Sequence, residues 1–254
     1  MRINTNVASL TANKNLFAIE KEVNASMARL SSGLRINKAS DDAAGMAIAN
    51  NLRTSTRALN VASNNAEQAT AMLQIAEGSA TVIQRILERQ KELYMQSQSA
   101  NYNGTISYLT DEFTTLSAES SRVIDSTNYQ GAAIFNTNLA FTVSDAAVGG
   151  TLNISLSLTT ASVSITTLSD VSAQLTAVNS VLGQLGAAQN RLAFTMSNVK
   201  NAIVNQAAAE SAIRDVDVAA EMAEFSKNQV LAQAGNAMLA QANQSSQSVL
   251  SLLK

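Results

Sequence analysis

Apolar positions between residues 48 and 87 repeat with the spacing of a long helix. Alternating steps of four and three residues from Ile48 to Leu87 meet Ala or a larger aliphatic residue everywhere except at Ser55, and no charge. A heptad pattern held for more than five repeats is typical of a helix packed along its whole length against other helices. Such a helix is about 60 Å long at 1.5 Å per residue. The periodicity alone fits an ordinary helical bundle equally well.

The same period predicts four more helices. We expect one at residues 3–34, one from Ile106 to about Val123, one from about Asp170 to beyond Ile203, and one at 217–253. The long helix should continue to about residue 100, where Asn and Gly residues at 101–104 indicate a turn. A short connection between two long heptad segments predicts an antiparallel pair of helices.

The middle of the chain, about residues 128–169, has a different pattern. Turn-forming Asn, Gln and Gly residues are followed by Phe141 and Val143, which alternate with polar neighbours, and by the pair Gly149–Gly150. Apolar and polar residues then alternate strictly from Leu152 to Leu158, as in a half-buried strand. Val163 and Ile165 suit one more strand. The predicted fold class is therefore mainly α, a long antiparallel helical bundle or coiled coil with a small β-hairpin in mid-chain.

Polar residues precede the long helix. Ser40, Asp41 and Asp42 suit the capping position, where a side-chain oxygen accepts hydrogen bonds from the first free N–H groups. Adjacent carboxylates also suit acid–base chemistry or a metal. We favour capping because no other type of metal ligand lies nearby.

The two ends of the chain are amphipathic helices of about 30 residues. Between Asn228 and Leu253 the sequence has no charged residue, whereas a solvent-facing helix usually carries Lys and Glu. An uncharged polar face fits a crowded assembly better, because buried charges need partners. We predict that packing inside an assembly involves Ile3, Val7, Leu10, Ile19, Val23, Met27, Leu30, Leu34, Leu231, Met238, Leu239, Val249, Leu250 and Leu253.

Composition narrows the function. The 254 residues include no His, no Cys and no Pro, and their formal net charge is −2. These absences remove the commonest general base, the commonest zinc ligands and the Cys nucleophile, and no cofactor is expected. Without a basic stripe a nucleic acid is not an expected partner, and no apolar run is long enough to span a membrane. The first residues lack the apolar core of a cleaved secretory signal, so any exit from the cell should use another route.

Several segments resemble the bacterial flagellins. LSSGLRINKASDDAAGMAIA at residues 30–49 is similar to the family's amino-terminal signature, and LAQANQSSQSVLSLL at 239–253 is similar to its carboxy-terminal one. RINTNVASL at 2–10 and IRDVDVAAEM at 213–222 also match. The resemblance covers roughly residues 1–140 and 170–254. The space between Phe135 and Asp170 is too short for an outer domain.

The resemblance implies an architecture and a function. Residues 1–40 and 211–254 would form the two halves of an inner coiled coil, and residues 41–210 a helical shell. The chain would be a structural subunit, not an enzyme, of the filament used for swimming. A hook–filament junction protein is the nearest alternative; an enzyme and a soluble helical adaptor are more distant ones.

The resemblance also implies partners and a location. Subunits would pass unfolded through a flagellar type III export apparatus, served by a chaperone, and polymerise outside the cell with hook-associated and cap proteins. Many flagellins are recognised by Toll-like receptor 5, and the matching positions here are Arg89, Leu93 and Glu112. An equally good interpretation is that Arg89 pairs with Glu112 between helices and Leu93 packs inside.

Overall fold

The structure is a computed structural model, and it describes residues 6–99, 106–144, 151–158 and 168–251. Its contacts group into two compact units, residues 1–54 with 206–254, and residues 55–205. The described segments near the two ends of the chain therefore belong to the same unit. The domain boundaries that we expect at residues 40 and 210 stay a prediction.

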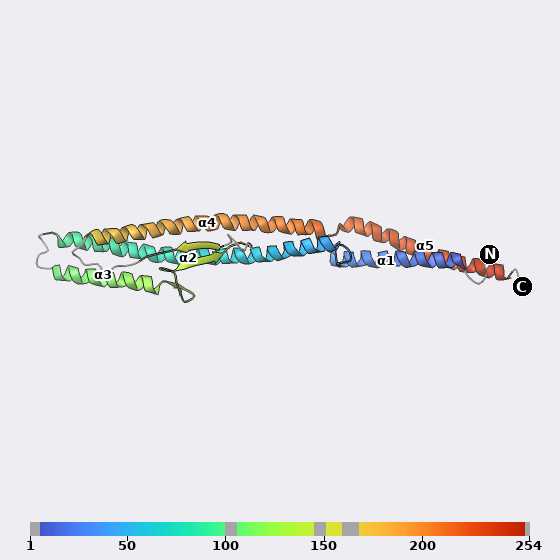
Figure 1. The fold of residues 1–254 in the computed structure, drawn as a ribbon, viewed down its shortest axis with the longest axis horizontal. Coiled ribbons are helices and arrows are strands. Elements are labelled where there is room, and N and C mark those ends of the chain that lie inside the picture. The colour runs from blue at the N-terminus through green and yellow to red at the C-terminus, as the bar shows by residue number, and fades with distance from the viewer. Residues whose placement is uncertain (1–5, 100–105, 145–150, 159–167, 252–254) are drawn as a thin grey trace. The chain divides into compact units, whose positions relative to one another are not determined.

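Long helices dominate both units (Figure 1). The helices are α1 (Val7–Ser32), α2 (Ala43–Ser97), α3 (Ile106–Ser126), α4 (Leu168–Arg214) and α5 (Val218–Ser251). The strands are β1 (Asn128–Tyr129), β2 (Ala132–Ala133), β3 (Asn138–Thr142) and β4 (Thr151–Ser155). The predicted fold class is confirmed: the protein is mainly α, with an antiparallel helix arrangement and a small β-hairpin in mid-chain.

In the unit of residues 1–54 and 206–254, α1 and α5 lie side by side and antiparallel (Figure 1). The Nδ2 of Asn6 donates to the carbonyl of Ala242 near one end of the pair, at 3.0 Å. Near the other end Leu34 and Asp215 form an antiparallel bridge. Contacts at both ends hold the two helices in register along most of the length of α1.

Capping explains where three of the helices begin or end. Gly33 ends α1 in the left-handed conformation, with φ of 71°, which glycine adopts without steric cost. Asp42 caps α2 by accepting from the backbone N of Gly45, and Asp217 caps α5 by accepting from Ala219 and Ala220. Capping is therefore confirmed for Asp42. Asp41 accepts instead from the backbone N atoms of residues 37–38, earlier in the same loop.

The unit of residues 55–205 packs α3 and α4 against α2. Fully buried side chains along α2, such as Leu73, Ile83 and Leu87, meet buried residues of α4 and of the β3–β4 hairpin in one core, against which Tyr129 of β1 also packs. Gln90 of α2 donates to the carbonyl of Phe113, and Ser79 accepts from Thr127. From one of these contacts to the other, the residue number falls on α2 and rises at the α3 side. The two helices therefore run antiparallel, and the predicted antiparallel helix pair is confirmed.

Two hairpins cover part of this core. β1 and β2 are joined by Gln130 and Gly131, both with positive φ, which is the conformation of a type I′ turn. β3 and β4 pair antiparallel with Leu139 opposite Ile154 and Phe141 opposite Leu152. On β4 the alternation of exposed and buried residues agrees with the pattern read from the sequence. The ladder of β4 stops at Ser155, earlier than the alternation to Leu158 suggested.

Asn136 explains why the strand ends there. This residue has a φ of 61°, and its side-chain amide donates to the carbonyl of Leu158 and accepts from the N–H of Leu158. One Asn side chain thus takes the place of a neighbouring strand. The expected turns at 101–104 and 149–150 and the strand suggested by Val163 and Ile165 lie outside the described residues.

Candidate assembly surface

The α1–α5 seam is a regular heptad repeat in which small and polar residues stand among larger apolar ones. The seam positions are partly or fully buried and follow steps of three and four on both helices. On α1 they are Ser9, Ala12, Leu16, Ile19, Val23, Ser26 and Leu30, and on α5 they are Glu221, Phe225, Asn228, Ala232, Gly235, Leu239 and Ala242.

Small residues let these helices approach closely. A Cβ atom built on Gly235 lies 3.2 Å from the Cδ1 of Leu16, which is tighter than ordinary contact. Ser26 and Asn228 are the described residues of α1 and α5 that are fully buried. The seam therefore brings the helices together while its large apolar members, such as Leu16 and Phe225, stay only partly buried.

Large apolar side chains of the pair are instead left in solvent. Phe17 is 71% exposed, and Leu10 lies seven residues earlier in the same row beside the seam. On α5, Leu231 and Met238 likewise share a row. The exposed large apolar residues of these two helices are Val7, Leu10, Phe17, Met27, Val218, Met222, Val230, Leu231 and Met238. So much exposed apolar surface is typical of a protein that binds others.

The residues that we predicted for packing in the assembly fall into three groups. Val7, Leu10, Met27, Leu231 and Met238 are exposed and available to a neighbour. The second group is half-buried within the α1–α5 unit itself and consists of Ile19, Val23, Leu30, Leu34 and Leu239. The third group lies outside the residues whose side chains are described and consists of Ile3, Val249, Leu250 and Leu253.

Sequence reasoning missed Phe17, the exposed aromatic residue of α1, and the buried residues Ser26 and Asn228. The signal for Phe17 was available, because Leu10 and Phe17 are seven residues apart. Ser26 and Asn228 give no such signal, since a polar residue does not mark a buried seam in a hydrophobic pattern.

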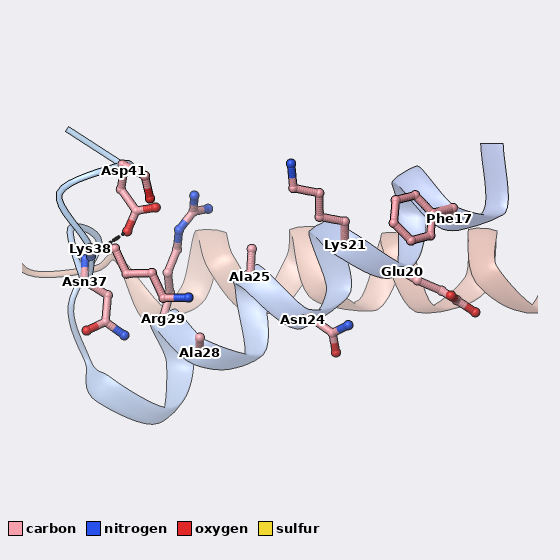
Figure 2. A pocket seen from close by; sticks show the side chains of 11 residues that line it. Phe17, Glu20, Lys21, Asn24, Ala25, Ala28, Arg29, Asn37, Lys38 and Asp41 are labelled. Atoms are coloured by element: carbon pink, nitrogen blue, oxygen red, sulfur yellow. Dashed lines mark hydrogen bonds between the residues drawn. The ribbon is translucent and has the colours of Figure 1, made fainter. Parts of the chain in front are cut away.

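A cavity of about 460 Å³ lies beside α1 (Figure 2). Figure 2 shows Phe17, Lys21 and Arg29 along α1, with Lys38 and Asp41 on the loop that follows it. Hydrogen bonds from the backbone N atoms of Lys38 and residue 37 lower the pKa of Asp41 below its ordinary value. This carboxylate is therefore occupied with the loop. The remaining charges are of both signs, so they do not select one kind of ligand.

Arg89, Leu93 and Glu112 lie close together where α2 meets α3. Arg89 donates to Glu112 and also pairs with Glu92, and these two carboxylates raise the pKa of Arg89. Leu93 is 0% exposed and packs with Phe113 and Val171. The chain thus has the interhelical pair and the packed Leu93, while Arg89 and Glu112 also keep some exposure. Contact with a receptor stays a prediction.

Within the described residues, no three Asp or Glu side chains gather as a metal site would require. None of the described helices has both the length and the apolar content needed to cross a bilayer.

Comparison with known proteins identifies the family. The bacterial flagellin N-terminal helical region matches residues 3–140, and the bacterial flagellin C-terminal helical region matches residues 168–253. The chain is 37% identical to a flagellin of Halalkalibacterium halodurans and 35% identical to one of Bacillus subtilis. It is 34% identical to the flagellar filament 33 kDa core protein of Treponema phagedenis. Each of these alignments covers 100% of both chains.

The extent of these matches agrees with the fold. The two family regions include all five helices and leave out residues 141–167 in the middle of the chain. Flagellins are structural proteins that form the extracellular flagellar filament. The chain belongs to the bacterial flagellin family and is a structural subunit of the flagellar filament, not an enzyme.

Proposed function

We propose that the exposed apolar side chains of α1 and α5 are the surface by which copies of this chain pack together in the filament. The observation that carries the proposal is that the described α1–α5 seam buries none of its large apolar side chains fully, whereas Leu10, Phe17, Leu231 and Met238 beside it stay exposed. Burying an aliphatic or aromatic side chain of this size contributes about 1.5–3 kcal/mol before ordering costs. Contacts between copies can therefore supply the apolar burial that the α1–α5 pair lacks in an isolated chain.

The contact should be heterologous, joining different surfaces of two identical copies. Non-closing contacts of that kind generate a helical fibre. The lack of charge on the second half of α5 supports this location, since a charged side chain buried among copies would need a partner.

The direct test is polymerisation of full-length monomers on filament seeds. The double variant Leu10→Lys, Phe17→Lys places two cations in the exposed apolar row of α1. We expect its critical concentration to rise at least about tenfold, because an unpaired buried charge costs more than the 1.4 kcal/mol that a factor of ten represents. Helical circular dichroism of the monomer should stay unchanged, since both side chains are exposed.

Asn15→Lys is the matched control. Asn15 is exposed on the same helix but lies in a row of polar residues. This variant should polymerise as the wild type does. Normal polymerisation of the double variant would contradict the proposal.

We further propose that the monomer leaves the cell unfolded through a flagellar export apparatus, with a chaperone, and joins the filament with hook-associated and cap proteins. The exposed apolar rows of α1 and α5 support a chaperone, because such surface promotes association of monomers before export. Co-purification of the intact chain with a flagellar chaperone, and its loss in variants of Leu231 and Met238, would test this step.

Recognition by Toll-like receptor 5 is a separate proposal about Arg89 and Glu112. The support is the exposure that both side chains retain beside their ion pair. Leu93 contributes by packing beneath them, since it has no exposed surface of its own. Arg89→Ala should lower receptor signalling, whereas Arg122→Ala, which breaks an exposed pair on α3, should not. Equal signalling from both variants would contradict receptor contact here.

A further inference from the structure

We propose that the sizes of facing side chains hold α1 and α5 in one register, and that residues of the seam thereby position the exposed apolar rows for assembly. The seam residues lie between two helices of the same chain and are partly or fully buried there. The inference rests on the proposed function only in taking the exposed rows as the surface that other copies contact. The register itself is a property of the single chain.

One close contact shows which seam residues face each other. A Cβ atom built on Gly235 lies 3.2 Å from the Cδ1 and 3.9 Å from the Cβ of Leu16, so these residues occupy one level of the pair. Up α1 from Leu16 the seam follows steps of three, four, three and four, and down α5 from Gly235 it follows the same steps. The steps on the other side of this level also agree. Because the helices run antiparallel (Figure 1), the seam residues face each other in successive layers.

Polar contacts toward both ends of the seam agree with these layers. Arg29 forms an ion pair with Glu221 at 3.4 Å, and Glu221 faces Leu30, the residue next to Arg29. At the opposite end the side-chain amide of Asn6 donates to the carbonyl of Ala242, which belongs to the last described layer. The register set by Leu16 and Gly235 therefore holds along the whole described seam.

Four of the seven described layers set a large apolar residue against a small one. The large residue comes from α1 in two of these layers and from α5 in the other two. Complementary sizes of this kind let side chains interdigitate without a void or a clash. The four layers are Ala12 with Leu239, Leu16 with Gly235, Ile19 with Ala232, and Ser26 with Phe225.

A shift of α5 along α1 would destroy this complementarity. One heptad is the smallest shift after which the steps of three and four match again. In one direction it sets Ile19 against Phe225 and two Ala residues against each other. In the other direction it sets Ile19 against Leu239, and Ser26 against Ala232. Either shift crowds one layer and leaves a void in another, and both overpacking and voids are destabilising.

Such a shift would also change the surface that the pair offers to other copies. Seven residues of helix are about 10.5 Å long, so Leu231 and Met238 would move by that distance relative to Leu10 and Phe17. A heterologous contact between identical copies repeats the same two patches at every step of a fibre, and it therefore needs patches of one fixed geometry. The residues of the four layers are thus positioning residues for assembly.

The register can be trapped by disulfides because the chain has no Cys of its own. A disulfide requires Cα atoms about 4.4–6.8 Å apart, and a position one heptad away lies about 10.5 Å further along the helix. Ser9→Cys with Ala242→Cys puts both thiols in one layer. Two offset pairs, Ala12→Cys with Ala232→Cys and Ser26→Cys with Ala232→Cys, face each other only after a shift by one heptad in one or the other direction.

Full-length Cys variants are grown on Cys-free filament seeds, oxidised and separated on non-reducing denaturing gels. A disulfide within one chain changes the mobility of the single chain, whereas a disulfide between copies gives a dimer. We expect at least about tenfold more intrachain product from the facing pair than from either offset pair. An offset pair that joins as well as the facing pair would overturn the single register.

A size exchange tests whether facing residues set the register. Gly235→Leu crowds the layer of Leu16 and should raise the critical concentration for seeded polymerisation about tenfold. Adding Leu16→Ala makes room and should return that concentration to within about threefold of the wild type. Ile19→Ala is the matched control, because it removes the same number of atoms from the neighbouring layer and should not restore polymerisation. Equal recovery with both second substitutions, or recovery with neither, would overturn the proposal.

The Leu10→Lys, Phe17→Lys variant, measured in parallel, separates this inference from the proposed function. If that variant polymerises normally, the exposed rows are not the assembly surface, while the disulfides still decide the register. If it fails to polymerise but the facing and offset Cys pairs join equally, this inference is wrong and the proposed role of the exposed rows stands.

Discussion

The α1–α5 pair and the core of residues 55–205 use the same heptad period to bury very different side chains. In the described part of α1 and α5 the fully buried residues are Ser26 and Asn228, whereas the core around α2 encloses Leu73, Ile83 and Leu87. The period shows that helices pack, but the size of the residues decides how much apolar surface the packing removes from water. The core around α2 buries its large apolar side chains within one chain, whereas the α1–α5 pair leaves its large apolar side chains partly or fully exposed.

The largest difference should appear when one apolar side chain is truncated in each region. Leu87→Ala leaves a cavity in the core and should cost about 2–5 kcal/mol of unfolding free energy. Ile19→Ala removes a half-buried side chain from the α1–α5 seam and should cost clearly less in the monomer. Urea unfolding of monomers, followed by circular dichroism, measures both. Equal losses would show that the terminal pair is as tightly packed as the core.

Gly235→Leu should loosen the α1–α5 pair and leave the core unchanged. A Cβ atom at this position already lies 3.2 Å from Leu16, and a larger side chain forces the helices apart at about 1–3 kcal/mol. Amide hydrogen exchange should show faster exchange in α1 and α5 but not in α2 or α3. The matched control is Gly186→Leu, which meets open space on α4. Unchanged protection of α1 in Gly235→Leu would contradict the close approach.

A smaller effect is expected at the turn that ends α1. Gly33 has a φ of 71°, its N–H donates to the carbonyl of Arg29, and its carbonyl accepts from Val216. Gly33→Ala should cost about 1–2 kcal/mol, because an L-residue is strained in this conformation. Gly33→Asn should cost less, since Asn tolerates it better. Thermal melting of the two variants compares them, and an Ala variant as stable as Asn would exclude backbone strain as the cause.

Helix order and the helix pairs could be predicted from the sequence because the heptad spacing survives in both regions. The prediction of buried positions was weakest where the heptad spacing does not show which face of a helix is covered. Ile48 fits the long repeat but is 52% exposed, and the buried residue at this point of α2 is its neighbour Ala49, at 0%. Met27 also fits a helical spacing but lies outside the α1–α5 seam, which passes through Ser26.

Side chains that hydrogen-bond to the backbone in place of a neighbouring strand could not be predicted from the sequence either. Asn136 holds Leu158 through its amide, and nothing in its sequence context distinguishes it from Asn138, which begins β3. For the same reason the sequence alone does not decide between Asp41 and Asp42 as the cap of α2. Both are good capping residues, and only geometry shows which one reaches Gly45.

The smallest expected effect is a pH dependence that belongs to the loop after α1 and not to the helical regions. The pKa of Asp41 is held below its ordinary value of 3.8, first by the hydrogen bond from the backbone N of Lys38 and then by that from Asn37. Because the folded state favours the charged form, this contribution to stability is present above pH 3.8 and is lost as pH falls through the lowered pKa. The NMR resonance of the Lys38 amide should therefore move only in the acid range. In Asp41→Asn the side chain has no charge to lose, so that movement should disappear while the amide signals of α3 titrate as before.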